Sequence, residues 1–80
     1  MPDQLTIYST QWCGYCHRLM RQLDREGVGY DVVDIEDEPE AADYVMSVNG
    51  GNQTVPTVVF PDGSALTNPS LMQVKERLAS

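Results

Sequence analysis

The chain has few of the features that would support a membrane or nucleic-acid role. Its 80 residues include five basic side chains against twelve acidic ones, and no long apolar run. The missing apolar run argues against a membrane-spanning helix. A net charge of −7 argues against general nucleic-acid binding, which depends on neutralising phosphates. Residues 1–4 lack the basic and apolar parts of a signal peptide, so we expect a cytoplasmic protein, with one domain over 1–80 that is monomeric.

Cysteine is also scarce, and the two cysteines lie close together in the run Trp12-Cys13-Gly14-Tyr15-Cys16. The residues before them, 5–8, are β-branched and aromatic and predict a strand, whereas apolar residues at helical spacing follow. A Cys-x-x-Cys at such a strand-to-helix junction is typical of thioredoxin-like redox sites. A helix start also stabilises a thiolate, the form that attacks disulfides. We therefore expect Cys13 to be the nucleophile and Cys16 the resolving thiol. The alternatives are two buried structural thiols or half of a metal site.

The remaining pattern predicts an α/β fold with element order βαβαββα, a four-stranded mixed sheet flanked by three helices. Strands are expected over 5–9, 30–35, 57–60 and 64–66, and helices over 13–26 and 39–48. A last helix is expected to begin with Asn68 as its cap and Pro69 at its first position. Apolar spacing predicts that these helices turn the following side chains inward: Ala41, Tyr44, Val45, Val48, Leu71, Val74 and Leu78.

These features resemble the glutaredoxin branch of the thioredoxin fold. The resemblance covers essentially the whole chain and rests on strand 5–8, the Cys13–Cys16 motif and the run Thr54-Val55-Pro56-Thr57. A narrower resemblance to the mycoredoxins of actinobacteria rests on segments 12–16, 47–52, 54–58, 62–63 and 66–69. It implies reduction of mixed disulfides between proteins and the small thiol mycothiol. No tightly bound cofactor is expected, and mycothiol serves as the co-substrate.

The resemblance also implies site residues. Pro56 is expected to follow a cis peptide bond, so that the backbone of Val55, beside Thr54, pairs with substrate next to Cys13. Trp12 and Tyr15 are interpreted either as an apolar rim for substrate or as ordinary packing around the motif.

The expected specificity for mycothiol over glutathione is inferred from positions at which this sequence differs from ordinary glutaredoxins. Those proteins carry a cation just before the motif and a Gly-Gly-x-Asp type turn after the last strand. Here residues 9–12 hold no cation, and 66–70 replace that turn. Mycothiol has sugar and inositol groups in place of glutathione's carboxylates, so the polar groups of Thr67 and Asn68 are expected to bind it.

Three further interpretations follow. In the first, mycothiolated proteins are the substrates, and an NADPH-dependent reductase regenerates mycothiol from its disulfide. In the second, a thioredoxin-reductase-linked redoxin supplies ribonucleotide reductase. In the third, Gly14 permits an iron–sulfur carrier, with one cysteine from each of two chains. A zinc site is not expected, because too few ligands are present.

Arg18, Arg21 and Arg25 share one helix face, which we interpret as solvated rather than as a guide for an acidic partner.

Overall fold

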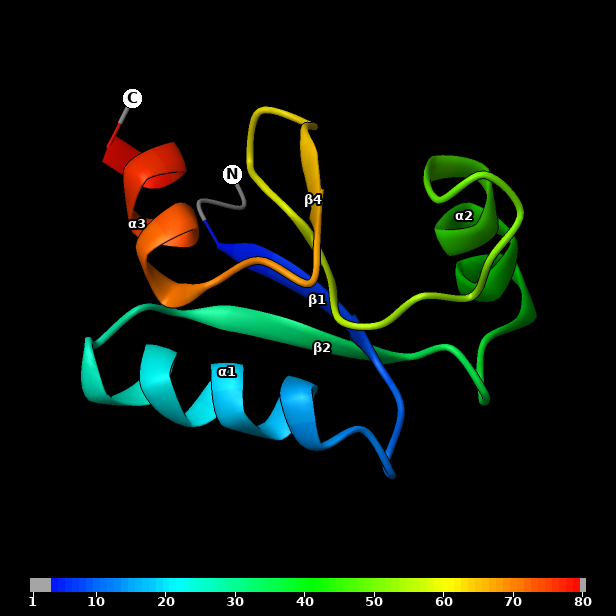
Figure 1. Ribbon diagram of the computed structural model, residues 1–80, viewed down its shortest axis with the longest axis horizontal. Helices are drawn as coiled ribbons and strands as arrows, with labels where there is room; N and C mark the ends of the chain where they lie inside the picture. Colours follow the sequence, from blue (N-terminus) through cyan, green and yellow to red (C-terminus); the bar gives the residue numbers. More distant parts are fainter. Residues whose placement is uncertain (1–3, 80) are drawn as a thin grey trace.

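The computed structural model describes residues 4–79 and confirms the expected fold (Figure 1). The elements follow the order β1 (Leu5–Ser9), α1 (Gly14–Arg25), β2 (Tyr30–Asp34), α2 (Pro39–Val48), β3 (Thr57–Val59), β4 (Ala65–Thr67) and α3 (Leu71–Ala79). The sheet order is β2-β1-β3-β4, so β2 and β4 form its two edges. β1 runs parallel to β2 and antiparallel to β3, and β3 runs antiparallel to β4.

The two faces of the sheet pack against different helices, because successive strand side chains alternate between faces. Leu5 and Ile7 of β1 join the buried core. That core also contains Leu19 and Leu23 of α1, Val58 of β3, Phe60 directly after β3, and Val74 of α3. Tyr8 points to the opposite face, where its ring centroid lies 5.2 Å from that of Tyr44 on α2. α1 and α3 therefore cover one face, and α2 covers the other near the end of β1.

Several predicted boundaries are displaced by one residue. Cys13 is the N-cap of α1 and lies outside the helix, because its own side chain accepts a helix N–H. At the other end Glu26 is the C-cap, and the next residue, Gly27, has a positive φ of 70° that ends the helix. The expected strands 30–35 and 57–60 stop at Asp34 and Val59. β4 starts one residue late because Ser64 is held in the turn by Asp62 Oδ1, which accepts from its N–H and hydroxyl.

Two of the expected inward-facing side chains are exposed. Val48 is 42% exposed and Leu78 is 39% exposed. Both lie in the last turn of short helices, beyond the part that packs on the sheet. Val45 and Val74, near the helix centres, are completely buried, so a single central residue anchors each helix.

The cap predicted for the last helix was wrong. α3 begins at Leu71, and Ser70 is the residue that caps it. Gln73 N–H donates to Ser70 Oγ at 3.1 Å, and Ser70 N–H donates to Gln73 Oε1 at 2.8 Å. This reciprocal pair is a capping box. Asn68 instead has a positive φ of 47° and ends β4, so Pro69 lies in the connecting loop.

Over residues 4–79 no helix has the length and apolar character needed to cross a membrane.

Candidate active site

The side chain of Cys13 occupies the N-cap position of α1. Its backbone is extended, with φ −84° and ψ 104°, and its Sγ accepts a hydrogen bond from the Cys16 N–H at 3.2 Å. A cap oxygen of serine or aspartate normally takes this place. The first turn of α1 contains no acidic side chain, so nothing there competes for the positive end of the helix. The Cys13 sulfur therefore takes the place of a capping oxygen at the positive end of α1.

Cys16 lies one turn further on and has a different environment. Both cysteines are free thiols, but Cys16 has no exposed surface, whereas Cys13 keeps 4%. Burial, together with the neighbouring Cys13 sulfur, raises the pKa of Cys16 from 9.0 to about 11. Removing a thiolate from water disfavours the charged form. The fold thus keeps Cys16 protonated while its backbone N–H supports Cys13.

Two aromatic side chains flank this recessed sulfur. Trp12 is 72% exposed and Tyr15 is 68% exposed. Large aromatic rings that bury little of their surface in their own fold are available for contact with another molecule. Their exposure disfavours the interpretation that they only pack around the motif.

The loop before β3 approaches the motif from the other side. The Val55–Pro56 peptide bond is cis, as expected. Cys13 Sγ lies 3.9 Å from the Val55 carbonyl oxygen. Val55 precedes β3, so its backbone groups lie outside the strand pairing, beside the sulfur.

A residue that the sequence did not single out holds this loop. Asn49 Nδ2 donates to the Val45 carbonyl at 2.8 Å and to Thr57 Oγ1 at 3.1 Å. Thr57 Oγ1 in turn donates to the Thr54 carbonyl at 2.8 Å, and the Thr67 hydroxyl donates to Asn49 Oδ1. Asn49 therefore ties the end of α2 to both ends of the Thr54–Thr57 turn and to β4. The sequence signal was an amide at the end of a helix, which also fits an ordinary cap.

Thr67 and Asn68, which were expected to act together, have different surroundings. The Thr67 side chain is turned to Asn49, and a hydroxyl that donates one bond keeps two lone pairs as acceptors. The Asn68 N–H donates to the Pro56 carbonyl at 2.7 Å, which joins this loop to the turn beside Cys13. The Asn68 side chain is exposed and lines a groove.

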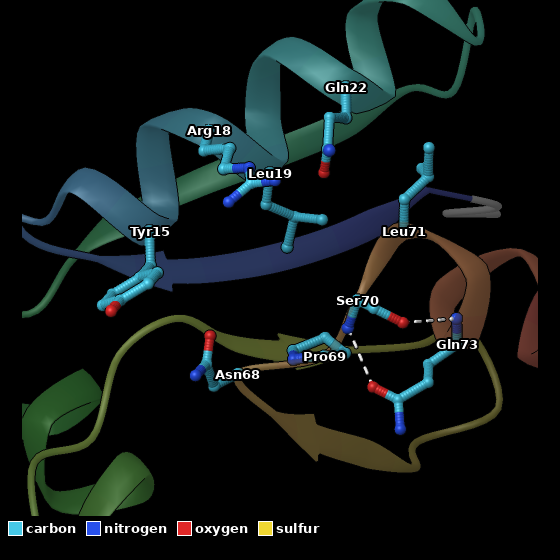
Figure 2. Close-up of a pocket in the computed structure, with 9 residues that line it drawn as sticks. All are labelled: Tyr15, Arg18, Leu19, Gln22, Asn68, Pro69, Ser70, Leu71 and Gln73. Carbon is cyan, nitrogen blue, oxygen red and sulfur yellow. Dashed lines mark hydrogen bonds between the residues drawn. The ribbon is translucent and has the colours of Figure 1, made fainter.

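That groove lies between α1 and the segment that leads into α3 (Figure 2). It has a volume of about 350 Å³. Tyr15 and Asn68 stand on opposite sides of one end (Figure 2). Arg18, Leu19 and Gln22 extend it along α1. One cation, Arg18, therefore reaches a surface next to the motif, although residues 9–12 and 66–70 contain none.

Within residues 4–79, no group of three or more histidine, cysteine, aspartate or glutamate side chains is arranged to hold a metal ion. The two cysteines and the surrounding amides are instead suited to thiol–disulfide exchange, in which a thiolate attacks a disulfide sulfur.

Comparison with known proteins agrees with this chemistry. The glutaredoxin family profile matches residues 5–64. A provisionally named glutaredoxin of Mycobacterium tuberculosis is 61% identical over 74 residues, which cover 92% of this chain and 88% of that protein. Mycoredoxin 1 of Corynebacterium glutamicum is 47% identical over 72 residues, covering 90% and 89%.

Solved structures show the same fold. A glutaredoxin from Archaeoglobus fulgidus superposes with a TM-score of 0.78 at 26% identity, covering 98% of this chain and 88% of that one. The glutaredoxin-like NrdH-redoxin of Escherichia coli also has a TM-score of 0.78, at 22% identity, covering 91% and 92%. The second likeness concerns the fold alone.

Proposed function

This chain belongs to the glutaredoxin family of thiol–disulfide oxidoreductases, and from that premise we propose that it reduces mixed disulfides between proteins and mycothiol. Cys13 is the nucleophile and Cys16 the resolving thiol. The observation that carries this assignment is the N-cap geometry, in which the Cys16 N–H donates to Cys13 Sγ beside the Val55 carbonyl. Mycoredoxin 1, at 47% identity, supports the choice of small thiol.

The reaction proceeds by two exchanges. The Cys13 thiolate attacks the mycothiol sulfur of the mixed disulfide; a new S–S bond forms at Cys13, and the protein sulfur leaves as a thiolate that takes a proton from water. The thiolate of a second mycothiol then attacks the mycothiol sulfur held on Cys13. Mycothiol disulfide leaves, Cys13 returns as a thiolate, and an NADPH-dependent reductase supplies two electrons to regenerate mycothiol.

Cys16 offers a second route. Its thiol loses its proton and attacks Cys13 Sγ, which releases mycothiol and leaves a Cys13–Cys16 disulfide. An external dithiol must then reduce that disulfide. Because burial raises the pKa of Cys16, we expect this attack to be slow at neutral pH and the mycothiol route to dominate.

The substrate is held by groups around the sulfur. The Val55 backbone pairs with the bound thiol, supported by Thr54 and the buried Pro56, and the rings of Trp12 and Tyr15 cover it. Asn68 and the free lone pairs of Thr67 bind hydroxyl groups of the sugar. A neutral polyol suits these loops better than glutathione, whose two carboxylates need charge partners in a cleft.

The deciding experiment compares one client peptide carrying either a mycothiol or a glutathione adduct, in wild-type protein and in Arg18→Gln. We expect kcat/KM to be at least about tenfold higher for the mycothiol adduct, a difference of about 1.4 kcal/mol. Arg18→Gln is expected to affect both adducts equally. Equal rates with both adducts in the wild-type protein would overturn the mycothiol assignment. A selective loss of glutathione activity in Arg18→Gln would show that Arg18 supplies a carboxylate partner for glutathione.

Two other observations would favour one of the alternative functions instead. Efficient reduction of the oxidised protein by thioredoxin reductase, without a small thiol, would favour the redoxin that serves ribonucleotide reductase. A brown colour with visible absorption after anaerobic purification would favour the iron–sulfur carrier.

A further inference from the structure

The basic side chains are concentrated on one helix. Three of the five, namely Arg18, Arg21 and Arg25, lie on α1, the helix that Cys13 caps. Within residues 4–79, none of these three lies within 4.0 Å of a carboxylate oxygen, whereas Lys75 Nζ is paired with Glu26 at 2.6 Å. A chain with a net charge of −7 therefore presents a local positive face along α1, and Arg18 is the member of that face closest in sequence to Cys13.

Arg18 is the arginine that lines the groove between α1 and α3. It lies five residues after Cys13, which is about 7.5 Å along a helix axis at a rise of about 1.5 Å per residue. An extended peptide covers this distance in about two to three residues, at about 3.3 Å each. Leu19 and Leu71 give the groove an apolar surface, and the Gln22 amide lies one turn beyond Arg18.

The position of the groove beside the motif places it within reach of a client protein. Cys13 attacks the mycothiol sulfur, and the client sulfur is bonded to that same sulfur at about 2.05 Å, so the client cysteine lies close to Cys13 at the moment of exchange. Tyr15, two residues from Cys13, lines the end of the groove. A client segment that runs from Cys13 past Tyr15 along α1 would reach Arg18.

We propose that this groove selects client segments with an aspartate or glutamate two or three residues from the reactive cysteine, and that Arg18 binds that carboxylate. The inference rests on the proposed function, because it concerns the protein half of the same mixed disulfide. Salt screens charges that lie further apart than the Debye length, which is about 8 Å at physiological salt. The selection of client segments therefore depends on charges close to the groove. No carboxylate of the acidic segment 31–40 lines the groove, whereas Arg18 does.

The test uses three peptides with a single cysteine and with glutamate, glutamine or lysine at the second and third positions on both sides. Each peptide is prepared as a mixed disulfide with mycothiol and with 2-mercaptoethanol, which needs no sugar site. Wild-type protein should reduce the glutamate peptide about three- to fivefold faster in kcat/KM than the glutamine peptide, the size expected for a partly exposed ion pair. The lysine peptide should be slowest, and the preference should fall at high salt.

Arg18→Gln and Arg25→Gln form a matched pair, since each removes one positive charge from α1 and Arg25 lies outside this groove. The glutamate-to-glutamine ratio should fall to near one in Arg18→Gln and change much less in Arg25→Gln. The reaction of Cys13 with iodoacetamide, a neutral reagent, reports whether the thiol itself has changed.

The outcomes separate the two proposals. A glutamate preference with both small thiols supports the inference even if mycothiol has no advantage over glutathione. No preference with either thiol overturns the inference and leaves the proposed function intact. An equal loss in both arginine variants would show a general attraction by α1 and would also overturn the role of the groove.

Discussion

The Cys16 N–H donates to Cys13 Sγ at 3.2 Å, while the Cys16 thiol itself is completely buried. The backbone N–H of Cys16 therefore supports the Cys13 sulfur, while the Cys16 side chain is shielded from solvent. Two identical side chains on one helical turn acquire different chemistry in this way. The sulfur at the helix start suits a charge, and the sulfur one turn inside is kept neutral.

Substitution of each cysteine should separate their roles. Cys13→Ser is expected to abolish reduction of mycothiol mixed disulfides, because its alcohol is a far weaker nucleophile than a thiolate. Cys16→Ser should retain much of that activity and lose turnover with dithiol substrates. Both variants are assayed on the same peptide adduct. An inactive Cys16→Ser protein of normal stability would contradict the one-thiol route.

Alkylation should be selective in the reduced protein. With a pKa of about 11, Cys16 is ionised in about one molecule in a thousand at pH 8. We expect iodoacetamide at pH 8 to modify Cys13 alone, as read by peptide mass mapping, and to reach Cys16 only after denaturation. Rapid double modification of folded protein would show that Cys16 is neither buried nor protonated as described.

The same shift makes the reduced protein less stable in alkali. The pKa of Cys16 is higher in the folded protein than in the unfolded chain, so its contribution is fully present below about pH 9. It is lost as the pH rises towards 11, since the unfolded state releases the proton first. Urea unfolding should therefore show a steeper fall between pH 9 and 11 in wild type than in Cys16→Ala. Parallel curves would exclude this linkage. The raised pKa values of Tyr8 and Tyr30 act in both proteins and cancel in the difference.

Asn49 should matter for both stability and turnover. Asn49→Ala leaves the hydroxyls of the buried Thr57 and the exposed Thr67 without their amide partner. The expected cost is about 1–3 kcal/mol in the free energy of unfolding. The kcat/KM for mixed disulfides should also fall, because the Thr54–Thr57 turn loses its support, while alkylation of Cys13 stays unchanged. Asn52→Ala is the control, since that side chain makes one exposed bond to the Asn49 carbonyl. Destabilisation with full activity would limit Asn49 to a structural role.

Substitutions at the two candidate caps of α3, Ser70 and Asn68, test which residue stabilises the start of the helix. Ser70→Ala should lower the free energy of unfolding by about 1 kcal/mol, because it removes the acceptor for the Gln73 N–H. Asn68→Gly should cost little, since glycine readily takes the positive φ found there. Urea titration of both variants decides the matter. The reverse order of the two effects would restore Asn68 as the cap.

The sequence predicts features that local pattern controls. The strand before Cys13 and the helix after it follow from apolar spacing, and α2 has the expected bounds because Pro39 and Gly50 border it. The start of α3 was missed because Asn68-Pro69 and Ser70-x-x-Gln73 are competing cap signals, and only packing selects between them. The role of Asn49 depends on β3–β4 pairing, which sets Thr57 opposite Thr67. The groove at Arg18 likewise exists only once α3 packs beside α1.

The edges of the sheet have a consequence for self-association. An unpaired edge strand offers N–H and C=O groups to another chain, and proteins resist such pairing with short edges and charged side chains. Here β4 has only three residues, and β2 carries the carboxylates of Asp31 and Asp34. Two copies meeting edge to edge along β2 would bring like charges together. The acidic side chains of β2 thus disfavour association of two copies through their sheet edges. Contact with other proteins is left to the surface around Cys13.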